Sequence, residues 1–226
     1  MNQNLKKLRQ PMSDAPTQVE ENSFLSRARY PKGKRSLQAI LDATYEIVVS
    51  EGLAGASQEA IARRANVTQS AVRHYFPTKE ELLLAFFSVG VERLQAIIDK
   101  KIAKEYSDPK TKLVAIAATH LDWISKTQDM YYFESSAFWG RNPGFQNLRG
   151  NWSQGLVKQY YKLIGEIQPN WSHQACEAAS FQVLTLTLGS WTTIGSTRPV
   201  HRRHSTRTLK AMVLEGINKI ISNTAP

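Results

Sequence analysis

Apolar residues recur at intervals of three and four positions through most of this 226-residue chain. The pattern is clear between Leu37 and Val48, where most apolar side chains would share one face of a helix. A half-buried strand would instead alternate apolar and polar residues every second position. No segment shows convincing alternation, and proline and glycine occur mainly between the periodic segments. We therefore expect an all-α fold.

Capping residues and chain breakers divide this pattern into separate helices. The first helix is predicted to begin at Lys34 and to end at Gly52, and Ser57, Thr68 and Thr78 are suitable N-caps for the next three. Pro77 ends the third helix after a few residues. The later helices are predicted near residues 79–105, 110–127, 129–139, 144–167, 172–195 and 205–222.

The two short helices between Ser57 and Pro77 have the pattern of a helix-turn-helix unit. Asn66 suits the left-handed break between them, and Ala62 is small enough for the helices to cross closely. The apolar residues available for the inner faces are Ile61, Ala62, Ala65, Val67, Val72 and Phe76. A surface turn of a helical bundle is the alternative interpretation of this spacing.

The side chains left to face outward on the second short helix are polar or small. They are Thr68, Gln69, Ser70, Ala71, Arg73, His74 and Tyr75. Gln can pair with adenine and Arg with guanine in a major groove, and Ala or Thr can contact a thymine methyl group. Tyr and Lys serve phosphate oxygens. This composition suits a recognition helix of a DNA-binding protein.

The charge balance agrees with a polyanionic partner. The formal net charge is +10 and the isoelectric point about 9.7. Residues 1–33 are polar and are expected to form a mostly disordered arm. Its end carries a basic cluster of Arg27, Arg29, Lys32, Lys34 and Arg35, which suits a phosphate backbone or a minor groove. A solvated tail explains the cluster equally well.

Other classes of protein lack support in the sequence. Cys176 is the only cysteine, so no intramolecular disulfide can form, which suits a cytoplasmic protein. No apolar run reaches the length of a membrane span. We find no nucleophile with a base and no phosphate-binding glycine loop, and His201 and His204 stand beside arginines that disfavour a metal. No enzymatic activity, metal or cofactor is therefore expected.

Four pieces of sequence between Arg35 and Leu82 resemble the DNA-binding domain of the TetR family of bacterial transcriptional regulators. They are "AILDAT", "EGLAGAS", "EAIARRANVTQSAV" and "HYFPTKEEL". The resemblance implies a DNA-binding domain at 34–80, followed by a larger helical domain for ligand binding and dimerisation at 81–226. By this resemblance the positions that meet DNA are Thr68, Gln69, Ser70, Ala71, Arg73, His74, Tyr75 and Lys79. Arg35 of the basic cluster and Ser57, at a cap position where the family commonly has Thr, are further candidate DNA contacts. Lys79 matches a lysine that contacts phosphate, whereas Arg73 stands where many members carry Tyr, so the operator sequence stays open.

In that family the later helices form a dimer interface and a ligand cavity. The positions that fit the interface are Ala175, Ala179, Gln182, Leu186, Gly189, Leu209, Met212, Val213, Gly216, Ile217 and Ile220. The aromatic and polar positions that fit a ligand site are Phe86, His120, Trp123, Phe133, Trp139, Trp152 and Tyr160. Ordinary core packing is the alternative explanation for both sets.

The expected function is that of a cytoplasmic homodimer that a small molecule releases from a palindromic DNA operator. The effector is expected to be partly apolar or aromatic. A DNA-binding protein without a small ligand, which organises DNA or docks a protein partner, is the alternative. The sequence leaves open the effector, the operator, the regulated genes, the sign of regulation and the role of the basic loop between Arg198 and Arg207.

Overall fold

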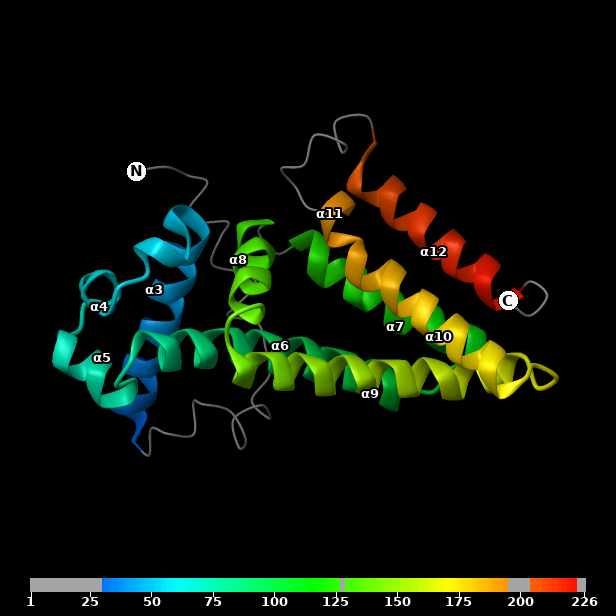
Figure 1. The fold of residues 1–226 in the computed structure, drawn as a ribbon, viewed down its shortest axis with the longest axis horizontal. Coiled ribbons are helices and arrows are strands. Elements are labelled where there is room, and N and C mark those ends of the chain that lie inside the picture. The colour runs from blue at the N-terminus through cyan, green and yellow to red at the C-terminus, as the bar shows by residue number, and fades with distance from the viewer. Residues whose placement is uncertain (1–29, 127–128, 195–203, 223–226) are drawn as a thin grey trace. The chain divides into compact units, whose positions relative to one another are not determined.

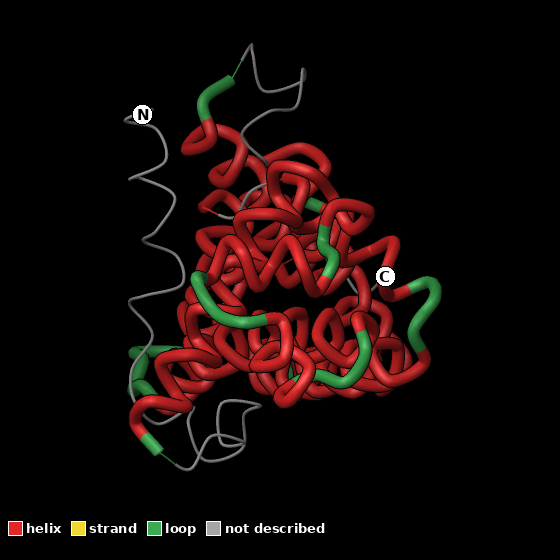
Figure 2. Tube along the Cα trace, turned by 90° about the vertical axis from the view of Figure 1, so that its left-hand side faces the viewer, coloured by secondary structure: helices red, strands yellow, loops and turns green. Residues whose placement is uncertain are grey.

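The computed structural model describes residues 30–126, 129–194 and 204–222, and these form helices joined by loops (Figures 1 and 2). No strand occurs in these ranges, which confirms the all-α class. Within the same ranges, no helix has both the length and the apolar character needed to cross a membrane. The basic arm up to residue 29 and most of the Arg198–Arg207 loop lie outside the described residues.

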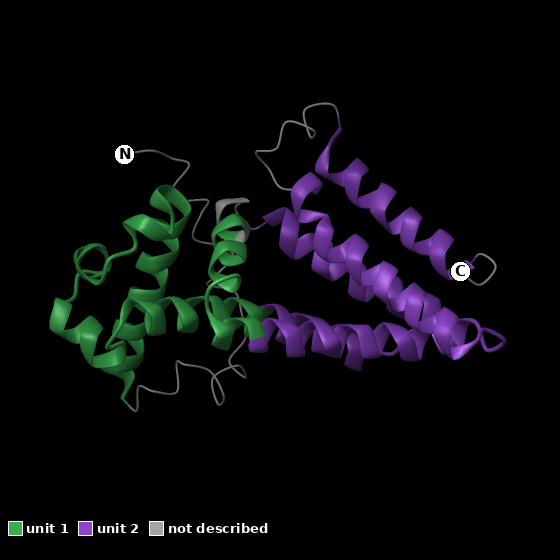
Figure 3. Cartoon of the chain, viewed as in Figure 1, with its two compact units in different colours: residues 1–93, 130–146 green, residues 94–129, 147–226 purple. Residues whose placement is uncertain are grey.

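The chain divides into two compact units (Figure 3). Unit 1 comprises Met1–Arg93 and Met130–Gln146, and unit 2 comprises Leu94–Asp129 and Asn147–Pro226. Unit 1 therefore takes in more of the chain than the helix-turn-helix segment expected at 34–80. The predicted functional boundary between residues 80 and 81 stays a prediction.

Unit 1 contains the helices of the N-terminal segment and parts of three later ones. The helices are α3 (Pro31–Gly55), α4 (Gln58–Ala65), α5 (Gln69–Tyr75), the first part of α6 (Lys79–Ala103), α8 (Asp129–Trp139) and the start of α9 (Pro143–Ile167). Helix α3 begins three residues before the predicted Lys34, because Pro31 occupies the first turn, where a proline needs no N–H partner. α4 packs against both α3 and α5.

Aromatic rings form much of the core of unit 1. Phe87 lies at the centre, with ring centroids 4.9 Å from Phe86, 5.5 Å from Tyr131, 5.2 Å from Phe138 and 5.4 Å from Phe145. Such pairs add about 0.5–1.5 kcal/mol each to the burial of apolar area. They join α6 to α8 and to the start of α9 within this unit.

Unit 2 is a helical bundle. Its helices are the remainder of α6 and α9, α7 (Pro109–Lys126), α10 (His173–Gly189), the short α11 (Trp191–Ile194) and α12 (Thr206–Ser222). The helix predicted at 172–195 is thus divided after Gly189. α7, α10 and α12 pack on one another around fully buried apolar side chains such as Ile116 and Ile217. An ion pair between Asp122 and Lys210 also links α7 to α12.

Gly52 produces a kink near the end of α3. Its backbone has φ 71° and ψ −177°, a conformation that is essentially restricted to glycine. An added Cβ atom would also lie 2.6 Å from Oε1 of Glu134 on α8. The helical backbone conformation is interrupted at this residue, which kinks α3 before its last turn.

We predict that Gly52→Ala destabilises the protein by about 1–3 kcal/mol, because alanine is strained in this backbone conformation. Chemical denaturation of the purified variant measures the change. Gly165→Ala is the matched control, since Gly165 lies inside α9 and an added Cβ meets no atom within 4 Å. The control should be neutral or slightly stabilising, and equal stability of the two variants would contradict the assignment of strain to Gly52.

Candidate nucleic-acid interface

Both short helices begin with the predicted side-chain caps. The hydroxyl of Ser57 accepts a hydrogen bond from the N–H of Ala60 at 3.1 Å, and that of Thr68 accepts one from Ala71 at 3.1 Å. Asn66 ends α4 in the left-handed conformation with φ 54°. The two caps and the left-handed break confirm the turn expected between α4 and α5.

The inner face of the pair is apolar and closely packed. Ile61, Val72 and Phe76 are completely buried, and Ala62 is 4% exposed. The N–H of Val67 donates to the carbonyl of Ala62 at 3.0 Å across the turn. Two other residues expected on this face, Ala65 and Val67, are only half-buried.

A side chain from α4 also fastens the far end of α5. The amide nitrogen Nε2 of Gln58 donates to the carbonyl oxygen of Phe76 at 2.6 Å. This carbonyl follows the last turn of α5, where no further helical N–H is available to it. α5 is therefore held at its start by Thr68 and at its end by Gln58, and Val72 seats its middle.

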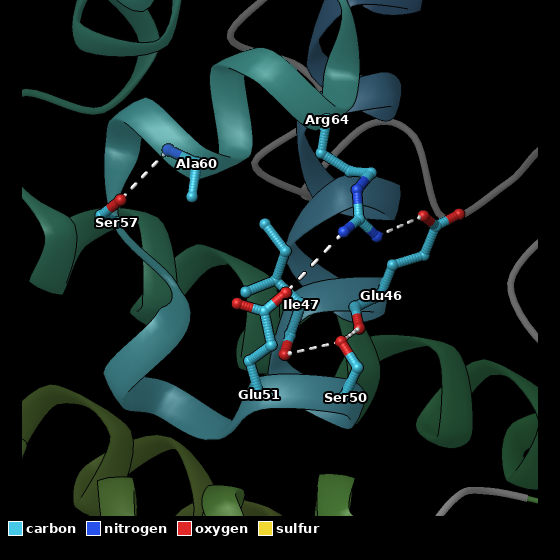
Figure 4. Close-up of polar contacts among 7 residues, drawn as sticks. All are labelled: Glu46, Ile47, Ser50, Glu51, Ser57, Ala60 and Arg64. Carbon is cyan, nitrogen blue, oxygen red and sulfur yellow. Dashed lines mark hydrogen bonds and ion pairs between the residues drawn. The ribbon is translucent and has the colours of Figure 1, made fainter.

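Arg64 links α4 to α3 through two carboxylates. Its guanidinium nitrogens lie 3.2 Å from Glu46 and 3.7 Å from Glu51 (Figure 4). All three side chains are 39–50% exposed, so solvent screens these pairs and each contributes under about 1 kcal/mol. These ion pairs connect α4 to α3, and the two carboxylates of α3 compensate the positive charge of Arg64.

The opposite face of α5 carries the side chains expected to meet DNA. Thr68, Ser70, Arg73 and His74 are exposed, whereas Gln69, Ala71 and Tyr75 are half-buried. The Tyr75 hydroxyl donates a long hydrogen bond of 3.4 Å to the carbonyl of Gly33, which brings the first turn of α3 beside the end of α5. Arg35, in the next positions of α3, is also exposed. The structure thus places the predicted contacts of α3 and α5 together in unit 1.

Lys79 has a structural contact that sequence reasoning missed. Its ammonium group donates to the carbonyl of Leu53 at 2.6 Å, immediately after the kink at Gly52. Sequence spacing offers no signal for this bond, because it depends on the interruption of α3. An ammonium group has three donors, so the bond leaves two for a phosphate oxygen. The phosphate role of Lys79 stays a prediction.

The side chains expected at a ligand site fall into both units. Phe86 is buried in the aromatic core of unit 1, and Phe133 and Trp139 are 56% and 44% exposed on α8. His120 and Tyr160 are buried in unit 2, with Trp123 and Trp152 half-buried beside its core. Core packing therefore accounts for Phe86, and the structure gives no basis for grouping all seven residues at one site.

The residues expected at the dimer interface also separate by burial. Ala175, Ala179 and Ile217 belong to the core of unit 2, whereas Gln182, Gly189 and Met212 are exposed. The remaining five, Leu186, Leu209, Val213, Gly216 and Ile220, are half-buried. Sequence reasoning missed Phe181 on α10, which is 63% exposed.

Residues 40–86 match the family model described as bacterial regulatory proteins, tetR family. The chain is 26% identical over 152 residues to the HTH-type transcriptional regulator BetI of Paraburkholderia xenovorans, covering 67% of this chain and 77% of that one. BetI of Paraburkholderia phytofirmans is 30% identical over 110 residues, covering 49% of this chain and 56% of that one.

The resemblance to the TetR family is thus confirmed over residues 40–86. Solved structures share the fold of this chain: a TetR-family regulator from Streptomyces coelicolor matches with TM-score 0.68 at 14% identity, over 91% of this chain and all of that one. A TetR transcription regulator from Haloarcula marismortui matches with TM-score 0.67 at 19% identity, over 82% and 96%. TetR-family proteins are regulators rather than enzymes.

We predict that Lys79→Gln has two separate effects. Loss of the bond to the Leu53 carbonyl should lower the free energy of unfolding by about 1–2 kcal/mol. If Lys79 also contacts phosphate, the slope of log affinity for DNA against log salt should fall by about 0.9 per half-site. Denaturation and binding titrations between low and moderate salt measure the two effects independently, and an unchanged salt slope would limit Lys79 to its structural role.

Proposed function

We propose that this TetR-family protein is a DNA-binding transcriptional regulator of the cytoplasm that acts as a homodimer and is released from its operator by a small molecule. The observation that carries the proposal is the seating of α5, a short helix fastened at both ends whose exposed side is polar. A helix that reads base edges must present its side chains without moving relative to its support.

The exposed side of α5 has the chemistry of both base and phosphate recognition. Arg73 and His74 in its last turn offer N–H donors, and Gln69 in its first turn offers an amide that can pair with adenine. Tyr75, the last residue of α5, reaches the first turn of α3, where Lys32, Lys34 and Arg35 supply positive charge. Acidic side chains are absent from the first turns of both α3 and α5.

Dimerisation would give the protein two reading heads for a palindromic operator. In unit 2, α10 and α12 pack together, and each exposes one large apolar side chain, Phe181 at 63% and Met212 at 55%. A second copy of the chain that covers both would form an interface of four helices. The two α5 helices would then need a separation of about one turn of DNA, roughly 34 Å.

Effector control requires different affinities of the ligand for two conformations of the dimer. α6 runs without interruption from Lys79, beside α5, to Ala103 in unit 2. It is therefore the shortest covalent path by which a ligand in unit 2 could change the separation of the two α5 helices. We propose that, in the ligand-bound dimer, the distance between the two α5 helices differs from one turn of DNA, so that both cannot enter the major groove at once.

Arg73→Ala and Tyr75→Ala are each expected to weaken binding to DNA that flanks the protein's own gene by about 1–3 kcal/mol. Electrophoretic mobility shifts at a fixed salt concentration measure the affinities. Lys162→Ala is the control, because Lys162 is an exposed cation on α9 in unit 2. Absence of sequence-specific binding to any genomic fragment would overturn the proposed function.

Phe181→Asp is expected to shift the protein from dimer to monomer, because burial of a carboxylate at the interface is unfavourable. Light scattering after size exclusion distinguishes the 25.5 kDa monomer from a species of twice that mass. Phe133→Asp is the matched control, since Phe133 is 56% exposed on α8 in unit 1. A Phe181→Asp variant that remains dimeric would place the interface elsewhere.

A further inference from the structure

The polar side chains of α5 and of its N-cap differ in whether they have a partner inside the chain. The hydroxyls of Thr68 and Ser70 lie 2.9 Å apart and share a hydrogen bond. The rings of His74 and Tyr75 meet nearly edge to face, with centroids 5.3 Å apart, and the Tyr75 hydroxyl donates to the carbonyl of Gly33. These four side chains are therefore already engaged within unit 1.

Gln69 and Arg73 are the long polar side chains of α5 that have no such partner in the part of the chain that the structure describes. The arginines of α4 differ in this respect, because Arg63 and Arg64 each lie within 4.0 Å of a carboxylate oxygen. α5 itself contains no acidic residue. The guanidinium of Arg73 and the amide of Gln69 are therefore available to a partner outside the chain.

Helix geometry places Gln69 and Arg73 on the same flank of α5, since residues four positions apart are neighbours on a helix surface. Successive residues are about 100° apart around the helix axis. The face opposite the buried Val72 is therefore centred on Ser70 and His74, which are both exposed. Gln69 and Arg73 border that face on one side, so both can reach a surface that lies against it.

The other flank of α5 turns toward α3. Tyr75 lies about 160° around the axis from Arg73, and its hydroxyl reaches Gly33 at the start of α3. Lys32 and Arg35 in the same part of α3 carry positive charge that suits phosphate oxygens. The cations suited to backbone contact thus lie on the side of Tyr75, and Arg73 lies on the side away from them.

The donor patterns of Gln69 and Arg73 match two different bases. A guanidinium donates two parallel N–H groups to O6 and N7 of guanine, whereas a glutamine amide donates to N7 of adenine and accepts from its amino group N6. Four residues of helix advance about 6 Å, and base pairs of B-DNA follow one another at about 3.4 Å. The two side chains therefore span about two base steps.

The end of α5 is held firmly enough for such a reading, which requires atoms aligned to about half an ångström. Val72, beside Arg73 in the sequence, is completely buried. The amide of Gln58 binds the carbonyl of Phe76 at 2.6 Å, directly after the last turn of α5. The backbone that carries Arg73 is thus supported on its inner side and at its end.

We propose that Gln69 and Arg73 read an adenine and a guanine that lie about two base steps apart in each half-site of the operator. Arg73 donates to O6 and N7 of the guanine, and the amide of Gln69 pairs with N6 and N7 of the adenine. This inference rests on the proposed function, because both contacts require α5 to enter the major groove. It adds the bases that this groove must present.

Selection of binding sites from a random double-stranded DNA library by the full chain tests the proposal. The enriched half-site should contain A·T and G·C pairs at the stated spacing. Arg73→Ala should lower the preference for guanine about tenfold or more and keep the adenine, and Gln69→Ala should do the reverse. An enriched site without this guanine, or a guanine preference that survives in Arg73→Ala, would overturn the assignment.

Base analogues in the selected site test the atoms of the guanine contact. 7-Deazaguanine lacks the N7 acceptor and should weaken binding by the parent protein about tenfold. Inosine keeps O6 and N7 and should bind as guanine does. In Arg73→Ala the deaza substitution should have little further effect, because the contact is already lost. Equal sensitivity of parent and variant to 7-deazaguanine would contradict the contact.

A contact of Arg73 with phosphate predicts a different result. Arg73→Ala would then weaken binding to all sequences equally and lower the slope of log affinity against log salt by about 0.9 per half-site. Loss of a contact with guanine leaves this slope nearly unchanged. Titrations of the selected site and of an unrelated duplex at several salt concentrations distinguish the two, and uniform weakening with the lower slope would overturn the proposal.

Matched variants separate base reading from folding and from the proposed function. Arg63→Ala removes an exposed arginine that faces a carboxylate of its own helix, and Gln38→Ala removes an amide that donates within α3. Both should select the parent half-site, and all four variants should keep a melting temperature close to that of the parent protein. Enrichment of a site that does not depend on Gln69 and Arg73 defeats only the base assignment, whereas failure to enrich any sequence defeats the proposed function.

Discussion

The structure of unit 1 depends on how a helix of seven residues, α5, is held in place. A helix of this length is unstable alone, since few backbone bonds compensate its cost of nucleation. Burial of Val72 and Phe76 fixes its inner side, Thr68 satisfies an N–H at its start, and Gln58 binds the carbonyl at Phe76. Every anchoring group lies on the inner side or at an end, so the outer side is free to carry polar residues. The same anchors therefore explain both the stability of α5 and its composition.

The supports of α5 are connected to the interruption of α3 at Gly52. The kink directs the last turn of α3 away from the helix axis, and the carbonyl of Leu53 becomes available to the ammonium group of Lys79. Lys79 begins α6, so one hydrogen bond joins the end of the first helix to the helix that follows α5. Arg64 adds a weaker link between α4 and α3 through Glu46 and Glu51. The backbone conformation of Gly52 thus lies next to the contacts that position α4 and α6, which flank α5 in the chain.

Local patterns predicted the helices well, because capping, proline placement and apolar spacing act within a few residues. Ser57, Asn66 and Thr68 have the roles that these rules assign to them. Contacts between distant positions were not predictable in the same way. The bond from Lys79 to Leu53 needs the kink at Gly52, and the exposure of Phe181 needs the packing of α10 against its neighbours. The position of Phe86 in the core was not predictable either, because an aromatic residue in a core and one in a ligand site have the same local sequence pattern.

The buried polar groups around α5 differ from those in the core of unit 2. In unit 1, the polar groups that hold α5 have partners inside the chain, as a rigid reading head requires. In unit 2, His120 and Trp152 have polar atoms that are buried without partners, at a cost to stability that apolar side chains would avoid. The polar groups around α5 therefore stabilise the element that they position, whereas those of His120 and Trp152 lower the stability of unit 2.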